Sequence, residues 1–183
     1  MNISGIKVRC LYPVPEENGF YAPWDKICTY SCIYCQLGRA VKVQAKRQEF
    51  YDPTELLEET KRILSSIHHK EEYPDYITIV PDGEPTLDSN LDILIKKLQT
   101  LKIPVAVISN ASLTHLPEVR DALLQADYVS LKIDTVNEET WRKINKPHRS
   151  LRLDEIFSGI RSFDLIQKTY YGGYTYYLRK FRK

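Results

Sequence analysis

Cys28-Thr-Tyr-Ser-Cys32-Ile-Tyr-Cys35 is the stretch around which the rest of this chain is organised, because it holds three of the four cysteines. Thiolates are soft ligands, so a run this dense either binds a metal or carries thiol redox chemistry. Most iron–sulfur sites use four cysteines, one for each iron. Three cysteines supply three irons of a cubane and leave the fourth iron open. The spacing therefore indicates an iron–sulfur centre that touches a substrate.

Two simpler interpretations of the cysteines stay open. Structural zinc usually takes four N/S ligands in paired knuckles, but Cys10 stands alone and no H-x3–5-H pattern follows. A disulfide is disfavoured by the compartment that the sequence indicates. The N-terminus lacks a basic region followed by an apolar one, and no apolar run approaches the ~20 residues that cross a bilayer. We therefore expect a cytoplasmic protein with no membrane segment, in which thiols stay reduced.

The composition favours a single globular domain and singles out no partner. A chain of 183 residues is long enough to bury a sizeable apolar core. With 26 basic and 24 acidic side chains, the formal net charge is only +2. A balance this even indicates neither a strongly basic nucleic-acid binder nor an acidic tail.

Strand and helix patterns alternate along most of the chain. Apolar and β-branched runs predict strands at 76–80, 103–108 and 128–133, with a weaker one within 3–15. Apolar residues at helical spacing predict helices at 53–67, 91–101, 116–125, 138–144 and 153–163. Asp52 is the expected N-cap of the first helix, with Pro53 as its first residue. The alternation predicts a parallel α/β sheet with right-handed crossovers.

Polar side chains follow the carboxyl end of each of the three clear strands. They are Asp82-Gly83-Glu84, Ser109-Asn110 and Lys132-Ile133-Asp134. Parallel α/β folds bind ligands at this end of the sheet. Gly83 lets the backbone approach a ligand closely, and Glu84 can accept hydrogen bonds from an ammonium group. Alternation along the strand places Lys132 and Asp134 on one face. We therefore expect these residues and the cysteines on one rim.

Each of these segments also has an ordinary structural interpretation. The 82–84 segment has the composition of a strand-to-helix turn. Ser109 and Asn110 are common in helix caps and turns. Lys132 and Asp134 could be a solvent-facing pair on an edge strand. The common placement of four candidate segments on one rim favours the functional interpretation over the separate structural ones.

The spacing C-x3-C-x2-C, with the aromatic Tyr34 before the last cysteine, resembles the signature of the radical S-adenosylmethionine (radical SAM) enzymes. Gly83-Glu84-Pro85-Thr86-Leu87 resembles the branch of that family that contains tRNA wyosine-synthesis-like proteins, as do 130–134 and 145–148. Asp82 stands where the family motif has its first glycine. The resemblance covers about residues 26–164, and family members commonly continue into further βα units.

This resemblance implies a fold and its cofactors. The fold would be an open, partial parallel (βα) barrel of about four to five βα units, since a closed barrel takes ~250 residues. Cys28, Cys32 and Cys35 would hold a 4Fe-4S cluster whose fourth iron binds the amine and carboxylate of S-adenosylmethionine (SAM). In the family, reduction of the cluster cleaves SAM to a 5′-deoxyadenosyl radical, which abstracts hydrogen from a substrate. An electron donor such as flavodoxin or ferredoxin is implied as a partner.

The resemblance also implies roles for the residues on the rim. Tyr34 would lie near the adenine of SAM. The segment Asp82-Gly83-Glu84 would hold the methionine amino group, with Glu84 as the acceptor. Ser109 and Asn110 would contact the ribose. Lys132 and Asp134 would face a ligand-filled lumen.

The composition changes after position 164. We therefore divide the chain into a core domain at 1–164 and a Tyr-rich basic tail at 165–183. Tyrosine runs on both sides of Gly172-Gly173 predict a hairpin. Aromatic and basic side chains together could grip RNA, but the shift in composition favours an aberrant or truncated end of the chain.

Two other functions stay open on the sequence alone. One is a non-catalytic module that binds zinc or an iron–sulfur cluster, and the other is an inactive fragment of a radical SAM enzyme. The basic segments 39–47 and 179–183 permit a tRNA substrate, while a protein or a small molecule is equally allowed. His148 and Arg149 could meet the substrate or the SAM carboxylate, although a loop histidine, here also His115, is more often structural.

Overall fold

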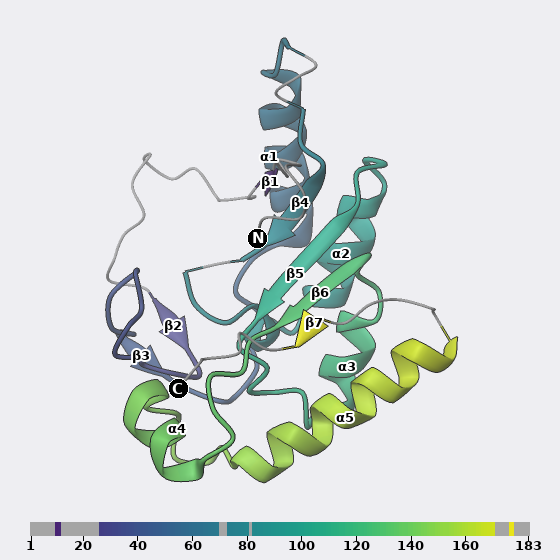
Figure 1. Ribbon diagram of the computed structural model, residues 1–183. Helices are drawn as coiled ribbons and strands as arrows, with labels where there is room; N and C mark the ends of the chain where they lie inside the picture. The colour runs from purple at the N-terminus through teal and green to yellow at the C-terminus, as the bar shows by residue number, and fades with distance from the viewer. Residues whose placement is uncertain (1–9, 12–25, 70–72, 81, 171–175, 178–183) are drawn as a thin grey trace.

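The computed structural model describes residues 10–11, 26–69, 73–80, 82–170 and 176–177, and its centre is a parallel five-stranded sheet (Figure 1). The strands are β1 (Cys10–Leu11), β4 (Tyr76–Ile79), β5 (Val105–Ser109), β6 (Tyr128–Leu131) and β7 (Tyr176–Tyr177), in the order β1-β4-β5-β6-β7. A smaller sheet pairs β2 (Ile27–Cys28) with β3 (Lys42–Val43), also in parallel. The predicted α/β fold with a partial parallel (βα) arrangement is confirmed.

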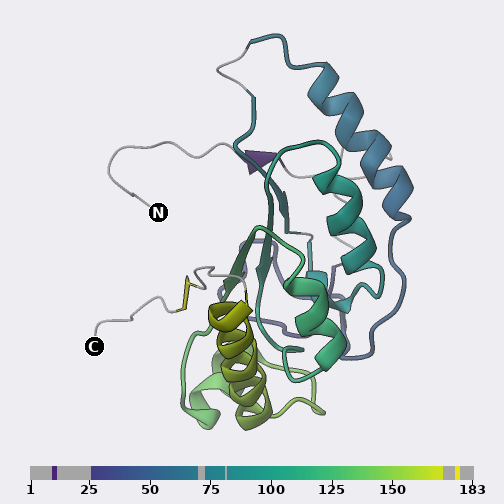
Figure 2. The same ribbon diagram turned by 90° about the vertical axis from the view of Figure 1, so that its right-hand side faces the viewer.

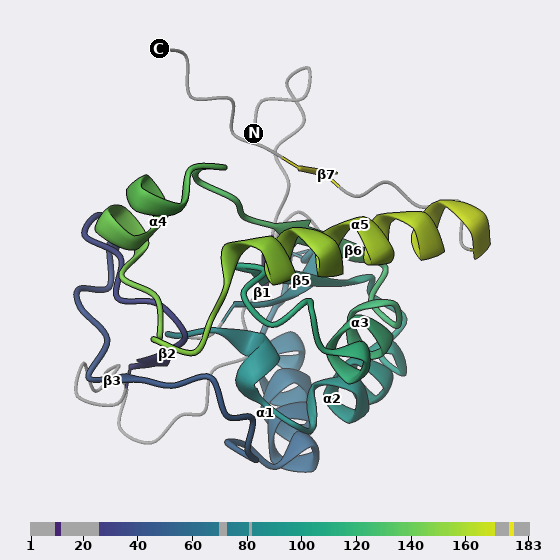
Figure 3. The same cartoon turned by 90° about the horizontal axis from the view of Figure 1, so that it is seen from below.

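Three helices cover one face of the large sheet (Figures 2 and 3). They are α1 (Pro53–Ser65), α2 (Leu91–Gln99) and α3 (Pro117–Leu123). Two further helices, α4 (Glu138–Asn145) and α5 (Leu153–Tyr170), follow β6. α5 packs tightly on the turn after β5, because a methyl group added at Gly159 would lie 2.3 Å from the Thr114 carbonyl. In the described part of the chain, no helix has the length and apolarity that a membrane crossing requires.

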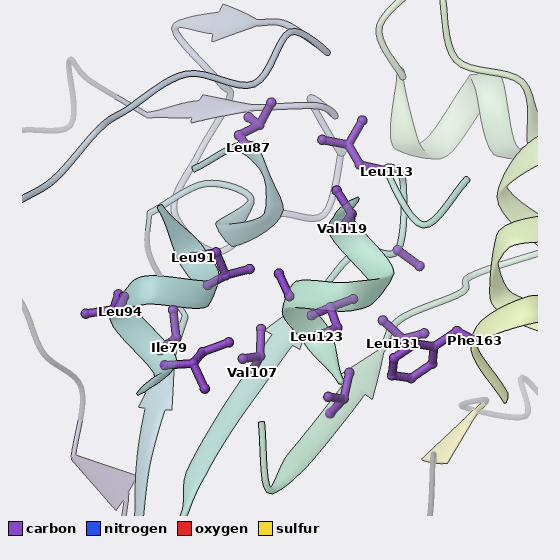
Figure 4. Close-up of a cluster of buried hydrophobic side chains, with 14 of the residues drawn as sticks. Ile79, Leu87, Leu91, Leu94, Val107, Leu113, Val119, Leu123, Leu131 and Phe163 are labelled. Atoms are coloured by element: carbon purple, nitrogen blue, oxygen red, sulfur yellow. The ribbon is translucent and has the colours of Figure 1, made fainter. Parts of the chain in front are cut away.

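The hydrophobic core lies between the sheet and the helices α1 to α3. Ile77 is paired with Val105 and Ile79 with Val107, so these four side chains share one face of β4 and β5. All four are buried in one apolar cluster with side chains of α2 and α3. Figure 4 shows Ile79 and Val107 beside Leu91, Leu94 and Leu123 of these helices. Full burial of a side chain of this size contributes about 1.5–3 kcal/mol. The core therefore holds the strands in the register that fixes their carboxyl ends.

Polar side chains fix where two of the helices begin. Asp52 Oδ1 accepts hydrogen bonds from the backbone N–H of Thr54 (2.6 Å) and Glu55 (3.4 Å), which confirms Asp52 as the N-cap of α1. Asn137 Oδ1 caps α4 in the same way, accepting from the Thr140 N–H at 2.9 Å. α4 ends at Asn145 because Lys146 adopts a left-handed conformation with φ 44°.

The structure corrects the prediction for the end of the chain. Of the segments on either side of the hairpin turn expected around Gly172-Gly173, α5 continues to Tyr170, and Tyr176–Tyr177 form β7, which pairs with β6 in parallel. The two glycines themselves lie outside the described residues. α5 also runs through position 164 without a break, well beyond the predicted end at 163.

Other differences concern short strands. β2 and β3 were not predicted, because two residues are too few to show an alternating pattern. Of the weak strand expected within 3–15, the described residues contain Cys10–Leu11, which pair with β4.

The carboxyl ends of β4, β5 and β6 lie at one edge of the sheet and point towards β2, β3 and α4 (Figure 1). Because the strands are parallel, the polar segments that follow them meet at this edge. The cysteine stretch begins at the end of β2 and lies against the same edge.

Candidate functional site

The cysteine loop, residues 28–35, starts in the small sheet and leaves it in a tight turn. Cys28 is the last residue of β2, and its carbonyl accepts a hydrogen bond from the Gln44 N–H at 3.0 Å. The Cys35 N–H donates to the Cys32 carbonyl at 3.3 Å, which closes a turn between these two cysteines. All three cysteines of the loop are free thiols, with Cys28 buried and the other two partly exposed.

Each of the three sulfurs has a nitrogen donor close by. The Lys26 ammonium lies 2.7 Å from Cys35 Sγ and 2.5 Å from the Gly38 carbonyl oxygen. The amide nitrogens of Asn110 and Asn145 lie 3.6 Å from Cys28 Sγ and 3.5 Å from Cys32 Sγ, respectively. Lys26 is only 5% exposed, so its charge needs partners inside the protein. A thiolate at Cys35 would be one such partner.

These surroundings fit a 4Fe-4S cluster held by the three cysteines. Among the described residues, no group of three or more His, Cys, Asp or Glu side chains is arranged to hold a metal ion. A cluster distributes its thiolate ligands over several irons, so the sulfurs need not meet at one point. Burial raises the pKa of the Cys28 thiol to about 11, and coordination by a metal removes that proton. Nitrogen donors around ligand sulfurs are also typical of cluster sites.

The C-terminal turn of α4 holds the middle of the cysteine loop through backbone hydrogen bonds. The Ser31 N–H donates to the Asn145 carbonyl at 3.0 Å, and the Ile33 N–H donates to the Ile144 carbonyl at 2.9 Å. The His148 N–H in turn donates to the Thr29 carbonyl at 2.9 Å. Helix carbonyls at a C-terminus lack partners within the helix, so the loop and the helix end satisfy each other.

Gly83 brings the segment after β4 into direct contact with the strand that leads to the cysteines. A Cβ atom at this position would lie 1.8 Å from the Ile27 carbonyl oxygen. Only glycine allows this approach of two backbones. The sequence predicted that Gly83 would approach a ligand, and the structure adds that it approaches β2. Gly83 thus fixes the distance between the rim and the cysteine loop.

Glu84 is a buried carboxylate with several hydrogen-bond donors. Its Oε1 accepts from the Thr86 N–H (3.1 Å), the Thr86 hydroxyl (2.6 Å) and the Ser109 hydroxyl (2.6 Å). Its Oε2 accepts from the Asn110 N–H at 2.8 Å. Burial raises the pKa of Glu84 despite these bonds, because they come from neutral groups and no ion pair to Glu84 occurs among the described residues.

The turn after β5 connects the buried carboxylate to the cysteine loop. The Asn110 side chain donates to Thr29 Oγ1 at 2.8 Å, and the Ser112 hydroxyl donates to the same oxygen at 2.7 Å. Ala111 has a φ of 64°, a left-handed conformation that is unusual for alanine. The turn therefore presents Asn110 to the residue beside Cys28 and its backbone N–H to Glu84.

Tyr34, Lys132 and Asp134 form one hydrogen-bonded group just past the end of β6. The Lys132 ammonium donates to Tyr34 Oη at 2.6 Å and to Asp134 Oδ1 at 2.7 Å, and the Tyr34 hydroxyl donates to Asp134 Oδ2. The ammonium also lies 4.5 Å from the centre of the Tyr34 ring. Burial alone would raise the pKa of Asp134, but hydrogen bonds from Lys132, Tyr34 and Asn145 lower it below its usual value.

A hollow lies between this group, the turn after β5 and the helices α4 and α5. Its lining consists of Tyr30, Asn110, Lys132, Ile133, Asp134, Thr135, Trp141, Asn145, Leu153 and Ile156. Three predicted site residues, Asn110, Lys132 and Asp134, are in this lining. Glu84 and Ser109 are buried outside this lining. They are connected to it by hydrogen bonds, because the Asn110 N–H donates to Glu84 Oε2 and the Ser109 hydroxyl donates to Glu84 Oε1. Asp82 is half-buried, and burial raises the pKa of its carboxyl group.

The three residues to which the sequence gave little weight, His148, His115 and Arg149, lie outside the polar group at the rim. His148 Nδ1 lies 2.8 Å from Ser150 Oγ, and the His115 carbonyl accepts from Arg120 at 2.9 Å. Arg149 is exposed. None of the three is in the lining of the hollow.

The sequence pattern of the radical SAM superfamily matches residues 26–171. The chain therefore belongs to the radical SAM superfamily. UPF0026 protein MJ1312 of Methanocaldococcus jannaschii is 42% identical over 138 residues, which are 75% of this chain and 42% of that protein. The chain thus spans less than half the length of this relative.

Solved structures support the fold. TYW1 with a lysine-pyruvate adduct bound superimposes with a TM-score of 0.53 at 21% identity, over 87% of this chain and 52% of that one. SuiB of Streptococcus suis bound to S-adenosylmethionine gives a TM-score of 0.54 at 20% identity, over 85% of this chain and 32% of that one. At this level of identity the likeness shows the fold alone.

Two residues of the site were not predicted from the sequence. Lys26 precedes the first cysteine of the motif by two positions, and a lysine so close to three thiols could have drawn attention. Asn145 lies more than a hundred positions after the cysteines, so the sequence gave no reason to place it beside them. Its only signal was that the 145–148 segment resembles the family. Its contact with Cys32 depends on how α4 packs.

Proposed function

We propose that this protein is a radical SAM enzyme in which Cys28, Cys32 and Cys35 hold a 4Fe-4S cluster whose remaining iron binds the amine and carboxylate of SAM. When bound and reduced, the cluster supplies the electron that cleaves SAM to methionine and a 5′-deoxyadenosyl radical for hydrogen abstraction. The observation that carries the proposal is the position of the three free thiols. They lie on one loop, each sulfur has a nitrogen donor, and the loop faces the polar rim.

Glu84 is the proposed acceptor for the amino group of SAM. Its carboxylate is 4% exposed and lacks a cationic partner among the described residues. Oε2 accepts one hydrogen bond, from Asn110, and so keeps a lone pair for a second donor. An ammonium group at this position would compensate the burial that raises the pKa of Glu84. Asp82 and Gly83 would shape the same subsite.

The remaining rim residues have proposed roles in orienting SAM. Ser109 and Asn110 would meet the ribose, Tyr34 would lie beside the adenine, and Lys132 and Asp134 would line the lumen. Asn110 already lines the hollow, as do Lys132 and Asp134. The hydroxyl of Tyr34 is fixed by Lys132 and Asp134, so its ring has a defined orientation for contact with a planar base. A flavodoxin or ferredoxin is the proposed electron donor.

The test is an assay for 5′-deoxyadenosine. The protein would be reconstituted anaerobically with iron and sulfide, reduced with dithionite and incubated with SAM, next to a Cys32→Ala control. We expect product from the wild type and none above background from the control. A cluster that forms without ever cleaving SAM would favour an inactive fragment. Failure to take up iron, together with binding of zinc, would favour a non-catalytic zinc module. Either result would contradict the proposed function.

A further inference from the structure

Asn145 is the last residue of α4, and its side chain reaches the cysteine loop and the rim together. The residue is 1% exposed. Its amide nitrogen lies 3.5 Å from Cys32 Sγ, 2.7 Å from Tyr34 Oη and 2.5 Å from Asp134 Oδ2. This one nitrogen is therefore within hydrogen-bonding reach of a cluster cysteine and of two residues of the polar group past β6.

The chemistry of these neighbours fixes which way the amide faces. Cys32 Sγ and the Asp134 carboxylate are acceptors, and the Tyr34 hydroxyl already donates to Asp134. Turning the amide over would place its oxygen against these acceptors, which is unfavourable. In the observed orientation the amide oxygen is buried and has no hydrogen-bond partner among the described residues. The contacts of the nitrogen must therefore outweigh the cost of that unpaired oxygen.

The backbone around Asn145 holds the side chain in this place. Its carbonyl accepts from the Ser31 N–H, one residue before Cys32. The left-handed Lys146 ends the helix directly after it. On the same helix, the Trp141 indole donates to Tyr30 Oη at 3.2 Å, and the two rings meet edge to face at 5.9 Å. Asn145 is thus held in place by the Ser31 hydrogen bond to its carbonyl and by the contact of Trp141, on the same helix, with Tyr30.

We infer that Asn145 is a positioning residue that donates a hydrogen bond to the Cys32 thiolate and raises the reduction potential of the cluster. The inference rests on the proposed function, because it requires that Cys32 ligates the cluster. Reduction adds negative charge, part of which is carried by the ligand sulfurs. An N–H group aimed at one of these sulfurs stabilises the reduced state more than the oxidised state. The amide has two N–H groups: one faces Asp134 Oδ2 at 2.5 Å, and the other lies within reach of Tyr34 Oη at 2.7 Å and of Cys32 Sγ at 3.5 Å. Because Tyr34 Oη already accepts from Lys132, the sulfur shares this second N–H when it carries a thiolate charge.

The test compares the midpoint potential of the reconstituted cluster in the wild type, Asn145→Ala and Asn137→Ala, by redox titration followed with EPR. Asn137→Ala is the matched control, because it removes the N-cap of the same helix and leaves the donor to Cys32 in place. We expect Asn145→Ala to shift the midpoint to a more negative value, by up to about tenfold in the equilibrium constant for reduction, or ~59 mV for one electron. Asn137→Ala should keep the wild-type midpoint.

The outcomes separate the inference from the proposed function. Equal midpoints in all three proteins, or equal shifts in both variants, would overturn the role of Asn145 while the cluster itself stands. A wild-type protein that takes up no cluster would overturn both. Asn145→Leu, which keeps the branched shape and lacks the donor, replaces the alanine variant if that variant does not fold. A folded Asn145 variant that loses the cluster while Asn137→Ala keeps it would overturn the role in tuning the potential, because the side chain would then be needed to assemble the site.

Discussion

The rim of the sheet and the cysteine loop face each other, but they are held by different means. On the rim, Glu84 and Ser109 are 4% and 2% exposed and satisfy each other within elements of the core. On the loop, Ile33 and Tyr34 are 61% and 45% exposed, and the hydrogen bonds that hold it come largely from α4, Lys26 and the turn after β5. The rim belongs to the folding core, as does the start of the loop from Cys28 to Tyr30, whereas the remainder of the loop is attached to that core.

This difference leads to a general expectation. Substitutions in the rim should cost folding stability, because they disturb buried groups that have no alternative partners. Substitutions in the partly exposed part of the loop, from Cys32 to Cys35, should cost cluster binding and leave the fold in place. The largest effect is expected at the three cysteines and the smallest at Asp134.

Replacing any one cysteine of the loop should abolish the cluster. Cys28→Ala, Cys32→Ala and Cys35→Ala each remove one of three ligands, and we expect iron and sulfide content after reconstitution to fall to background. The thermal midpoint of the cluster-free protein should change little for Cys32 and Cys35, which are partly exposed. Full iron content in a variant that lacks all three cysteines would refute the assignment of the ligands.

Gly83→Ala should disturb rim and loop together. The new methyl would meet the backbone oxygen of Ile27, which cannot rotate away, and we expect a loss of about 3 kcal/mol in the free energy of unfolding. Urea unfolding measures this loss. Gly159→Ala is the matched control, since its methyl would meet the Thr114 carbonyl at 2.3 Å, away from the cysteines. Both variants should lose stability, but Gly83→Ala alone should also lose cluster uptake per folded molecule.

Glu84→Gln should destabilise the rim by about 1–3 kcal/mol, because the amide would turn an NH2 group towards donors. Urea unfolding of the cluster-free protein tests this. Glu58→Gln serves as the comparison. Glu58 is exposed and pairs with Lys61 at 2.7 Å on the surface of α1, so its loss should cost less than about 0.5 kcal/mol. Equal effects of the two substitutions would show that the rim carboxylate is not part of the folding core.

Asp134→Asn should have the smallest effect, and it should depend on pH. The pKa of Asp134 is lowered in the folded protein, so its contribution is present above the unfolded pKa of ~3.9 and is lost as the pH falls through the folded pKa. We expect the wild type to be more stable at pH 7 by no more than about 1 kcal/mol, and the difference to shrink below about pH 4 and to vanish once the pH is below the folded pKa. Asp92→Asn, in an exposed pair with Lys96 at 3.4 Å, is the surface control and should cost less stability at pH 7 in the same urea titrations.

The sequence predicted the parts of the molecule that local chemistry decides. Asp52 and Pro53 mark the start of α1, because a cap and a proline act on their own turn. The runs at 76–80, 103–108 and 128–133 contain β4, β5 and β6, because apolar, β-branched runs in an α/β chain are buried as strands of the central sheet. Parallel pairing then brought their polar ends to one edge.

What the sequence did not reveal depends on packing between distant segments. The contacts of Asn145 with Cys32 and of Lys26 with Cys35 follow from how α4 and β2 meet the loop. The second role of Gly83, its approach to Ile27, likewise needs both backbones in place. The parallel pairing of β7 with β6 was not predicted either, because it joins segments that lie far apart in the sequence.

The central claim is that three cysteines hold a cluster with one iron open to SAM. EPR spectra of the reconstituted, dithionite-reduced protein, recorded with and without SAM, test it most directly. We predict a signal of a reduced 4Fe-4S cluster that changes its g values when SAM is added and is absent from Cys32→Ala. A cluster signal that SAM leaves unchanged, or a protein that binds zinc and takes up no iron, would contradict the claim.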